Sequence, residues 1–159
     1  MDETMDEPHA INATRVSYTL ESTLASVTKA EQAAAEVAAR FGFQSDECGR
    51  IAMAVREAAV NAVLHGNRCD PTKRVTLSFE ATPDALTVAV CDQGPGLDPS
   101  TLPDPLAPEN LLKASGRGIF LIRTFMDEIR FQTMSPGTEV IMIKFVRGPG
   151  RDRSKEDNQ

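Results

Sequence analysis

The sequence predicts an α+β fold, a two-layer α/β sandwich in which a mainly antiparallel, mixed sheet carries helices on one face. Three observations support this prediction. Residues 24–41 and 45–66 repeat their apolar side chains at helical spacing. Residues 74–91 and 129–145 each contain two stretches of alternating apolar and polar residues with a short turn between them. Residues 118–126 return to helical spacing between these two hairpins.

The first strand is predicted at residues 15–20, where apolar and polar side chains alternate. Two helices separate this strand from the later ones. We therefore expect it at an edge of the sheet, with Val16, Tyr18 and Leu20 exposed. The Ala-rich stretch 24–41 follows as the first helix.

The second helix is expected to begin near Ser45, with Ser45 or Asp46 as its cap, and to end at Gly66. Its apolar residues cover more than one face of the helix. This pattern indicates that the helix is buried beneath the sheet.

The two hairpins turn at residues 82–84 and 135–137, and a long loop precedes the helix between them. Residues 92–115 hold five prolines and two glycines, which is the composition of a loop. A loop of this length inside a compact domain is usually functional. We therefore expect a lid that orders over a bound ligand.

Composition and charge indicate one domain at residues 14–147, between a disordered acidic leader at 1–13 and a disordered charged tail at 148–159. The net charge of −6 argues against a nucleic-acid binder. The sequence shows no signal peptide and no apolar run of about 20 residues, so we expect no membrane contact and a cytoplasmic location. The three cysteines are widely spaced, which favours free thiols over a metal site or disulfides.

The first candidate motif lies on the second helix, where Glu57, Asn61 and His65 follow one another at intervals of four residues. This spacing places a carboxylate, an amide and an imidazole on one helical face. Polar groups on an otherwise apolar helix need partners, which a ligand can provide. The alternative is that Glu57 and Asn61 satisfy each other or reach solvent.

The second motif begins where the hydrophobic strand 85–91 runs into Asp92, followed by Gly94 and Gly96. A carboxylate at a strand end can accept a hydrogen bond from an amino group such as that of adenine. The two glycines let the backbone pass close to a flat ring or a phosphate. An ordinary turn would have the same residues, and no helix starts at the last glycine, as a Rossmann motif would require.

The third motif is Gly116, Arg117 and Gly118 at the start of a helix. Free N–H groups at a helix start bind anions, and an arginine there can hold a terminal phosphate. The alternative is a hinge with a surface arginine. A fourth segment, the turn that leads into Thr138, is uninformative alone.

Together and in this order, the four motifs resemble the nucleotide site of the GHKL ATPases, whose ATP-binding domain has the Bergerat fold. The branch that the sequence resembles most is the anti-sigma-factor serine/threonine protein kinases. The resemblance covers residues 14–147. The short length favours this branch, because histidine kinases add a dimerising helical hairpin and the other GHKL enzymes add a second domain.

The resemblance implies a role for each residue. Glu57 would be the catalytic general base, Asn61 would bind the Mg²⁺ that bridges the phosphates of ATP, and Asp92 would recognise adenine. The remaining residues would surround the nucleotide: Gly94 and Gly96 at the adenine, Thr138 beside it through Asp92 or a water, Gly116, Arg117 and Gly118 over the β- and γ-phosphates, and His65 either near the phosphates or as a structural helix end.

The leading hypothesis is therefore an ATP- and Mg²⁺-dependent serine/threonine protein kinase that acts as an anti-sigma factor. It would phosphorylate a STAS-type anti-anti-sigma partner, hold a sigma factor and form a homodimer. Two alternatives stay open: a nucleotide-gated binding module without kinase activity, and a detached histidine-kinase catalytic domain. Glu57 favours a kinase, because a pure binding module needs no general base.

Overall fold

The computed structural model describes residues 4–5, 14–95 and 118–146. The strands are β1 (Thr4–Met5), β2 (Thr14–Glu21), β3 (Arg74–Ala81), β4 (Ala85–Cys91), β5 (Glu128–Thr133) and β6 (Thr138–Phe145). The helices are α1 (Leu24–Arg40), α2 (Ser45–Val60), the π-helix η1 (Asn61–Gly66) and α4 (Gly118–Phe125). The helices and hairpins predicted from the sequence are all present within a few residues of their expected bounds.

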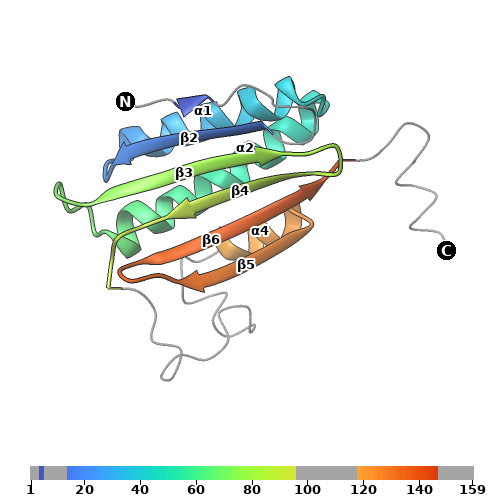
Figure 1. Ribbon diagram of the computed structural model, residues 1–159. Helices are drawn as coiled ribbons and strands as arrows, with labels where there is room; N and C mark the ends of the chain where they lie inside the picture. Colours follow the sequence, from blue (N-terminus) through green and yellow to red (C-terminus); the bar gives the residue numbers. More distant parts are fainter. Residues whose placement is uncertain (1–3, 6–13, 96–117, 147–159) are drawn as a thin grey trace.

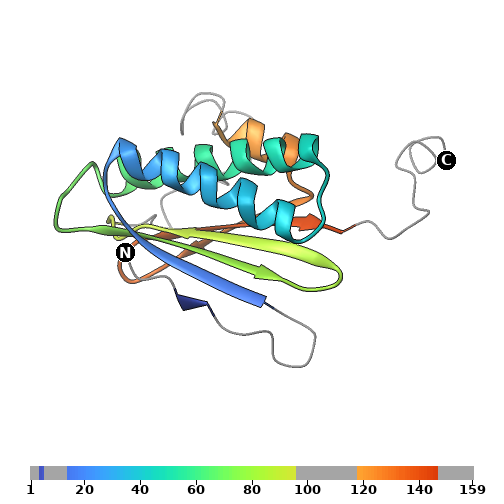
Figure 2. The ribbon, with the colours of Figure 1, turned by 90° about the horizontal axis from the view of Figure 1, so that it is seen from above.

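The strands form one sheet in the order β1-β2-β3-β4-β6-β5 (Figure 1). The helices cover one face of this sheet and leave the other face open (Figure 2). This arrangement confirms the two-layer α+β prediction. Every pairing between described strands is antiparallel, so the parallel part of the expected mixed sheet is absent from them.

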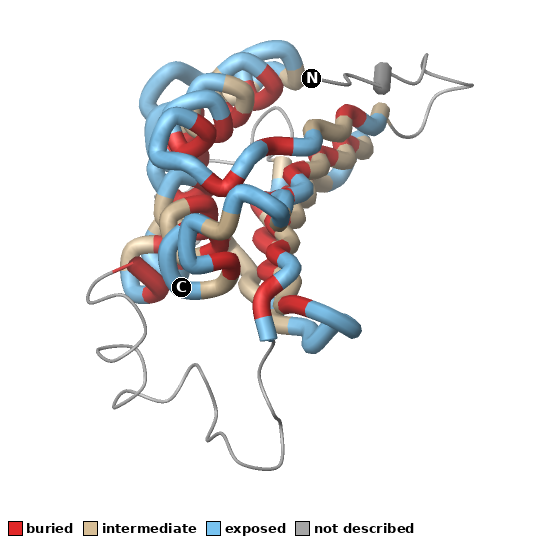
Figure 3. The backbone as a smooth tube through the Cα atoms, turned by 90° about the vertical axis from the view of Figure 1, so that its left-hand side faces the viewer, coloured by how far each residue is buried: buried red, intermediate tan, exposed pale blue. Residues whose placement is uncertain are grey.

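The hydrophobic core contains residues from both the helices and the strands. Along the backbone tube, buried residues alternate with more exposed ones (Figure 3). On β3 and β4 every second residue is buried, which is the pattern of strands with one covered face. No helix in the described part of the chain has the length and apolar character needed to cross a membrane.

The two long helices begin in different ways. At α1, Oγ1 of Thr23 accepts a hydrogen bond from the backbone N–H of Ser26 at 3.2 Å, which is an N-cap. At α2, the N-cap residue is Gln44, and its side chain makes no capping hydrogen bond. The expected cap by Ser45 or Asp46 is therefore wrong. Both residues lie inside the first turn, where the Asp46 carboxylate interacts favourably with the helix dipole.

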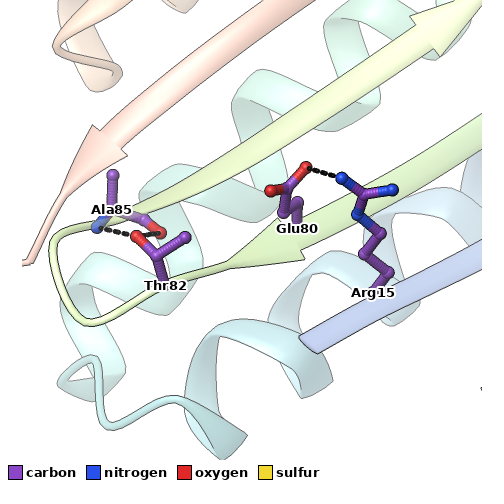
Figure 4. A network of polar contacts seen from close by, with 4 residues as sticks. All are labelled: Arg15, Glu80, Thr82 and Ala85. Atoms are coloured by element: carbon purple, nitrogen blue, oxygen red, sulfur yellow. Dashed lines mark hydrogen bonds and ion pairs between the residues drawn. The ribbon is translucent and has the colours of Figure 1, made fainter. Parts of the chain in front are cut away.

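The hairpin between β3 and β4 is closed by Thr82, whose Oγ1 accepts a hydrogen bond from the N–H of Ala85 at 3.1 Å (Figure 4). On the neighbouring pair of strands, Arg15 of β2 and Glu80 of β3 stand opposite each other in register. Their side chains form an ion pair of 3.3 Å. The Thr82 contact lies in the turn that leads into β4, the strand that Asp92 directly follows.

The prediction for β2 is wrong in one respect, because its apolar side chains are not exposed. Val16 and Leu20 are only 2% and 5% exposed. The ring of Tyr18 packs edge-to-face on Phe79, with 6.1 Å between the centroids. The strand turns this face toward the helices, as β3 does, so burial of the apolar side chains decides its orientation.

The strand β1 corrects two further expectations. It pairs with β2 at Val16 and Ser17, so β2 has a neighbour on both sides there. It also lies within residues 1–13, expected as a disordered leader, and that expectation is wrong for Thr4–Met5 because their backbone pairs with β2. The rest of the leader and the tail 148–159 lie outside the described residues.

Candidate nucleotide-binding site

Asp92 follows the end of β4 and is 8% exposed. Its Oδ1 accepts hydrogen bonds from the backbone N–H groups of Gly94, at 2.9 Å, and Thr138, at 3.2 Å. Burial raises the pKa of the Asp92 carboxyl above its ordinary value. The two N–H groups and the positive charge of Lys73 oppose this shift in part. The sequence analysis did not single out Lys73.

Three glycines close around Asp92. A Cβ atom on Gly66 would overlap the Asp92 carboxylate, and one on Gly94 would overlap the carbonyl group of Gly66. At Gly137, φ is +112°, and a Cβ atom would overlap the carbonyl oxygen of Asp92. Three segments therefore meet around Asp92 at distances that only glycine permits: the end of η1, the turn after β4 and the turn before β6.

Of these glycines, only Gly94 was predicted as a site residue. Gly66 was interpreted only as the end of a helix, and Gly137 only as part of a turn. Each adjoins a predicted site residue, His65 or Thr138, which is the signal in the sequence that could have identified it. Thr138 itself contacts Asp92 through its backbone: its N–H donates to the carboxylate, and its carbonyl accepts from the N–H of Asp92 at 3.0 Å.

The second group of polar side chains lies where α2 passes into η1. The Glu57 side chain is 20% exposed, and its carboxylate lies 3.7 Å from the guanidinium of Arg56. Asn61 is the first residue of η1, and its Oδ1 is buried without a hydrogen-bond partner among the described residues. His65 is exposed. The three side chains therefore differ in burial, from the buried Asn61 oxygen to the exposed His65.

The buried Oδ1 atom of Asn61 fits the predicted magnesium site. A buried polar atom without a partner costs about 1–3 kcal/mol, which a ligand can recover. An amide oxygen is a ligand of the type that Mg²⁺ prefers, and this ion is commonly held by few protein groups together with substrate phosphates. Among the described residues, no group of three or more His, Cys, Asp or Glu side chains could hold a metal ion. The phosphates of a nucleotide and water would have to complete the coordination.

The structure joins these two groups through η1. This helix begins at Asn61 and ends at Gly66, and Gly66 packs on the Asp92 carboxylate. Gly118 is buried at the start of α4, which packs against α2. The other residues predicted to close over the nucleotide, Gly96, Gly116 and Arg117, lie outside the described residues, as does the segment expected to act as a lid.

Residues 20–144 match the model of a family described as the histidine kinase-like ATPase domain. The chain is 36% identical over 118 residues to the serine-protein kinase RsbW of Bacillus subtilis, covering 70% of this chain and 73% of that protein. It is 28% identical over 116 residues to the serine-protein kinase RsbW of Listeria innocua, covering 69% of this chain and 73% of that protein.

Two solved structures have a similar fold. A Mycobacterium tuberculosis structure of RsbU and RsbW domains superposes with a TM-score of 0.61 at 18% identity, covering 84% of this chain and 33% of that one. The histidine kinase domain of a blue-light activated histidine kinase from Erythrobacter litoralis superposes with a TM-score of 0.52 at 19% identity, covering 76% of this chain and 59% of that one. At these identities the similarity concerns the fold alone.

Proposed function

The chain belongs to the histidine kinase-like ATPase family, in its serine-protein kinase branch, and we propose that it transfers the terminal phosphate of Mg·ATP to a serine or threonine of a partner protein. The observation that carries this proposal is that η1 connects two buried polar groups. We call the surroundings of Asp92 the base end, for the adenine base, and the surroundings of Asn61 the phosphate end. Asp92 offers a buried carboxylate among glycines, and Asn61 offers a buried oxygen to which no described residue donates a hydrogen bond.

At the base end, both hydrogen bonds that Asp92 accepts from described residues go to Oδ1. Its Oδ2 then accepts from the amino group of adenine, while the glycines let the ring approach the backbone. Guanine presents a carbonyl oxygen in that position, so the carboxylate selects adenine. This residue therefore supplies the nucleotide preference that a protein kinase needs.

At the phosphate end, Asn61 would hold the Mg²⁺ ion, which would supply positive charge to the phosphates when bound. Glu57 lies one turn earlier on α2 and orients or deprotonates the hydroxyl that attacks the terminal phosphate. Its contact with Arg56 is long and partly exposed, and such ion pairs contribute little. The Glu57 carboxylate therefore remains available to the acceptor.

The acceptor we propose is a STAS-type anti-anti-sigma protein, and the second partner is a sigma factor held while the first is phosphorylated. The resemblance of the motifs to anti-sigma-factor kinases supports both assignments, together with a regulatory role in transcription, a cytoplasmic location and a homodimer.

The test incubates the chain with candidate STAS proteins, Mg²⁺ and γ-labelled ATP, and then identifies the phosphorylated amino acid. We expect acid-stable phosphoserine or phosphothreonine. Glu57→Ala should abolish transfer and leave ATP binding intact, whereas Asn61→Ala should lose both through the metal. Glu31→Ala is the matched control, because Glu31 pairs with the same Arg56 from α1, outside the site.

Three outcomes would contradict the proposal. Acid-labile phosphohistidine would identify a detached histidine-kinase catalytic domain. ATP binding without transfer to any candidate would favour a nucleotide-gated binding module. Transfer at the wild-type rate by Glu57→Ala would remove this residue from the reaction.

A further inference from the structure

One buried polar side chain beside the site has no part in the proposed mechanism. Asn67 directly follows η1 and is 1% exposed. Its Nδ2 donates to Oγ of Ser22 at 2.8 Å and to the carbonyl of Arg74 at 3.0 Å. Its Oδ1 accepts from the backbone N–H of Gln93 at 2.7 Å. Unlike Asn61, this asparagine uses both amide hydrogens and its oxygen within the protein.

The partners of Asn67 come from three separate segments. Ser22 lies between β2 and α1, Arg74 begins β3, and Gln93 follows Asp92. The Gln93 side chain returns to the same place, since its Oε1 accepts from the N–H of Arg74 at 2.6 Å. We call the side chains of Ser22, Asn67 and Gln93, with the backbone of Arg74, the clasp.

The clasp fixes the turn that presents Asp92. The N–H of Gln93 belongs to the peptide that directly follows Asp92, and the next N–H, that of Gly94, donates to the Asp92 carboxylate. On its other side, the N–H of Asn67 donates to the carbonyl of Ala62 at 2.8 Å, within η1. One residue therefore ties the helix that carries Asn61 to the turn that carries Asp92.

We propose that Asn67 is a positioning residue of the nucleotide site, which sets the affinity for the adenine nucleotide by holding the turn after Asp92 against the end of η1. This inference rests on the proposed ATP site and deepens it. If this turn shifts by a fraction of an ångström, the sheet can still form. The Asp92 carboxylate then no longer lies at hydrogen-bond distance from the amino group of adenine. The amide of Asn67 is fully used in bonds to Ser22, Arg74 and Gln93, so its loss should affect binding rather than the transfer step.

The experiment measures the Kd of Mg·ATP by calorimetry, at a temperature at which each variant is folded by circular dichroism. Asn67→Ala should raise the Kd, and the KM for ATP, about tenfold or more, with kcat at saturating ATP within about threefold of the wild type. Ser22→Ala is the matched control, since it removes one clasp partner and leaves the bond from Gln93 to Asn67 in place. It should lower stability and leave the Kd within about twofold.

If Asn67→Ala does not fold, Asn67→Asp provides the same test. It keeps the oxygen that accepts from Gln93 and loses the donor to Ser22 and Arg74, so it should be less stable and yet bind ATP nearly as well as the wild type. A Kd for Asn67→Ala equal to that of Ser22→Ala, or a tenfold weaker Kd for a folded Asn67→Asp, would overturn the inference.

These results are separable from the fate of the proposed function. Calorimetry needs no phosphoacceptor, so a chain that binds ATP without phosphorylating any partner still tests Asn67. A wild-type chain that binds no ATP would overturn both proposals together.

Discussion

The two ends of the site contain similar polar atoms in opposite circumstances. At the base end, Oδ1 of Asp92 accepts hydrogen bonds from two backbone N–H groups, and the backbone of three glycines packs closely around this residue. At the phosphate end, Oδ1 of Asn61 is buried with no partner among the described residues. Asp92 as a whole is only 8% exposed, so both atoms belong to buried parts of the chain, yet the described residues satisfy only one of them.

Because of this difference, the two ends would contribute to nucleotide binding in different ways. The base end of the proposed site is preorganised, so binding adenine there would need no rearrangement of Asp92 and would lose little entropy. The phosphate end leaves an oxygen unsatisfied, and that cost is recovered only when an ion or a donor arrives. Substitutions at the two ends should therefore affect the ligand-free protein in different ways.

The largest effect on ligand-free stability is expected for Asp92→Ala. It removes the acceptor of two N–H groups, those of Gly94 and Thr138, and unsatisfied buried donors cost about 1–3 kcal/mol each. Urea unfolding of the ligand-free protein should show a loss of about 2–4 kcal/mol. Asp84→Ala, at the exposed β3–β4 turn, is the control. Equal losses for the two variants would mean that the base end is not held by these bonds.

The next effect concerns the glycines. Gly94→Ala forces a Cβ atom onto the carbonyl group of Gly66, and such overpacking costs about 1–3 kcal/mol. Gly49→Ala is the matched control, because no atom lies within 4 Å of a Cβ at this helical position. It should stabilise the fold by about 0.5–1 kcal/mol through helix propensity. Thermal unfolding checks both signs, and stabilisation by Gly94→Ala would contradict the close packing at the base end.

Some residues of this site could be predicted from the sequence, and others could not. Asp92 was identified because it follows a hydrophobic strand directly, and Asn61 because it lies four residues from both Glu57 and His65 on a predicted helix. The fold followed from the same periodicity, including the β3–β4 hairpin and its turn. Gly66 and Gly137 were missed as site residues, since a glycine that ends an element and one that packs on a distant carboxylate have the same sequence signal.

Other features could not be predicted because they depend on contacts between distant segments. The orientation of β2 is set by burial against Phe79 of β3, and an alternating strand does not show which face the sheet will cover. The π-helix η1 leaves no mark in the residue spacing either. The partners of Asn67 lie up to 45 residues away, so its role appears only in the folded chain.

A smaller effect on stability is expected for Asp92→Asn, which keeps an oxygen for both N–H groups and removes the charge. Burial raises the pKa of Asp92, so the folded chain binds the proton more tightly than the unfolded chain does. The stability that this proton adds is present below the ordinary value of about 3.9 and is lost as the pH rises through the folded-state pKa. The ionised carboxylate therefore costs stability at neutral pH.

Asp92→Asn should consequently be at least as stable as the wild type at pH 8, with a smaller advantage at pH 4, close to the ordinary carboxyl pKa of about 3.9. Denaturant unfolding at the two pH values measures this difference. The variant should at the same time bind ATP more weakly by about 1–3 kcal/mol, since the charge-assisted bond to adenine is lost. An advantage that grows toward pH 4 would show that the carboxylate is stabilised as an anion.

The smallest effect is expected for Asn61→Ala in the ligand-free protein. The substitution removes a buried oxygen that has no partner among the described residues, and this gain offsets the packing lost with the side chain. We therefore expect the free energy of unfolding to stay within about 1 kcal/mol of the wild type or to rise. The matched control is Asn67→Ala, which removes an equally small amide whose bonds are all made within the protein and should cost about 1–3 kcal/mol.

Mg·ATP at 100 times its Kd should stabilise the wild type by about 2.7 kcal/mol and the Asn61 variant hardly at all. A ligand-free loss at Asn61 as large as that at Asn67 would mean that both ends are satisfied by the protein, and the contrast between them would fail.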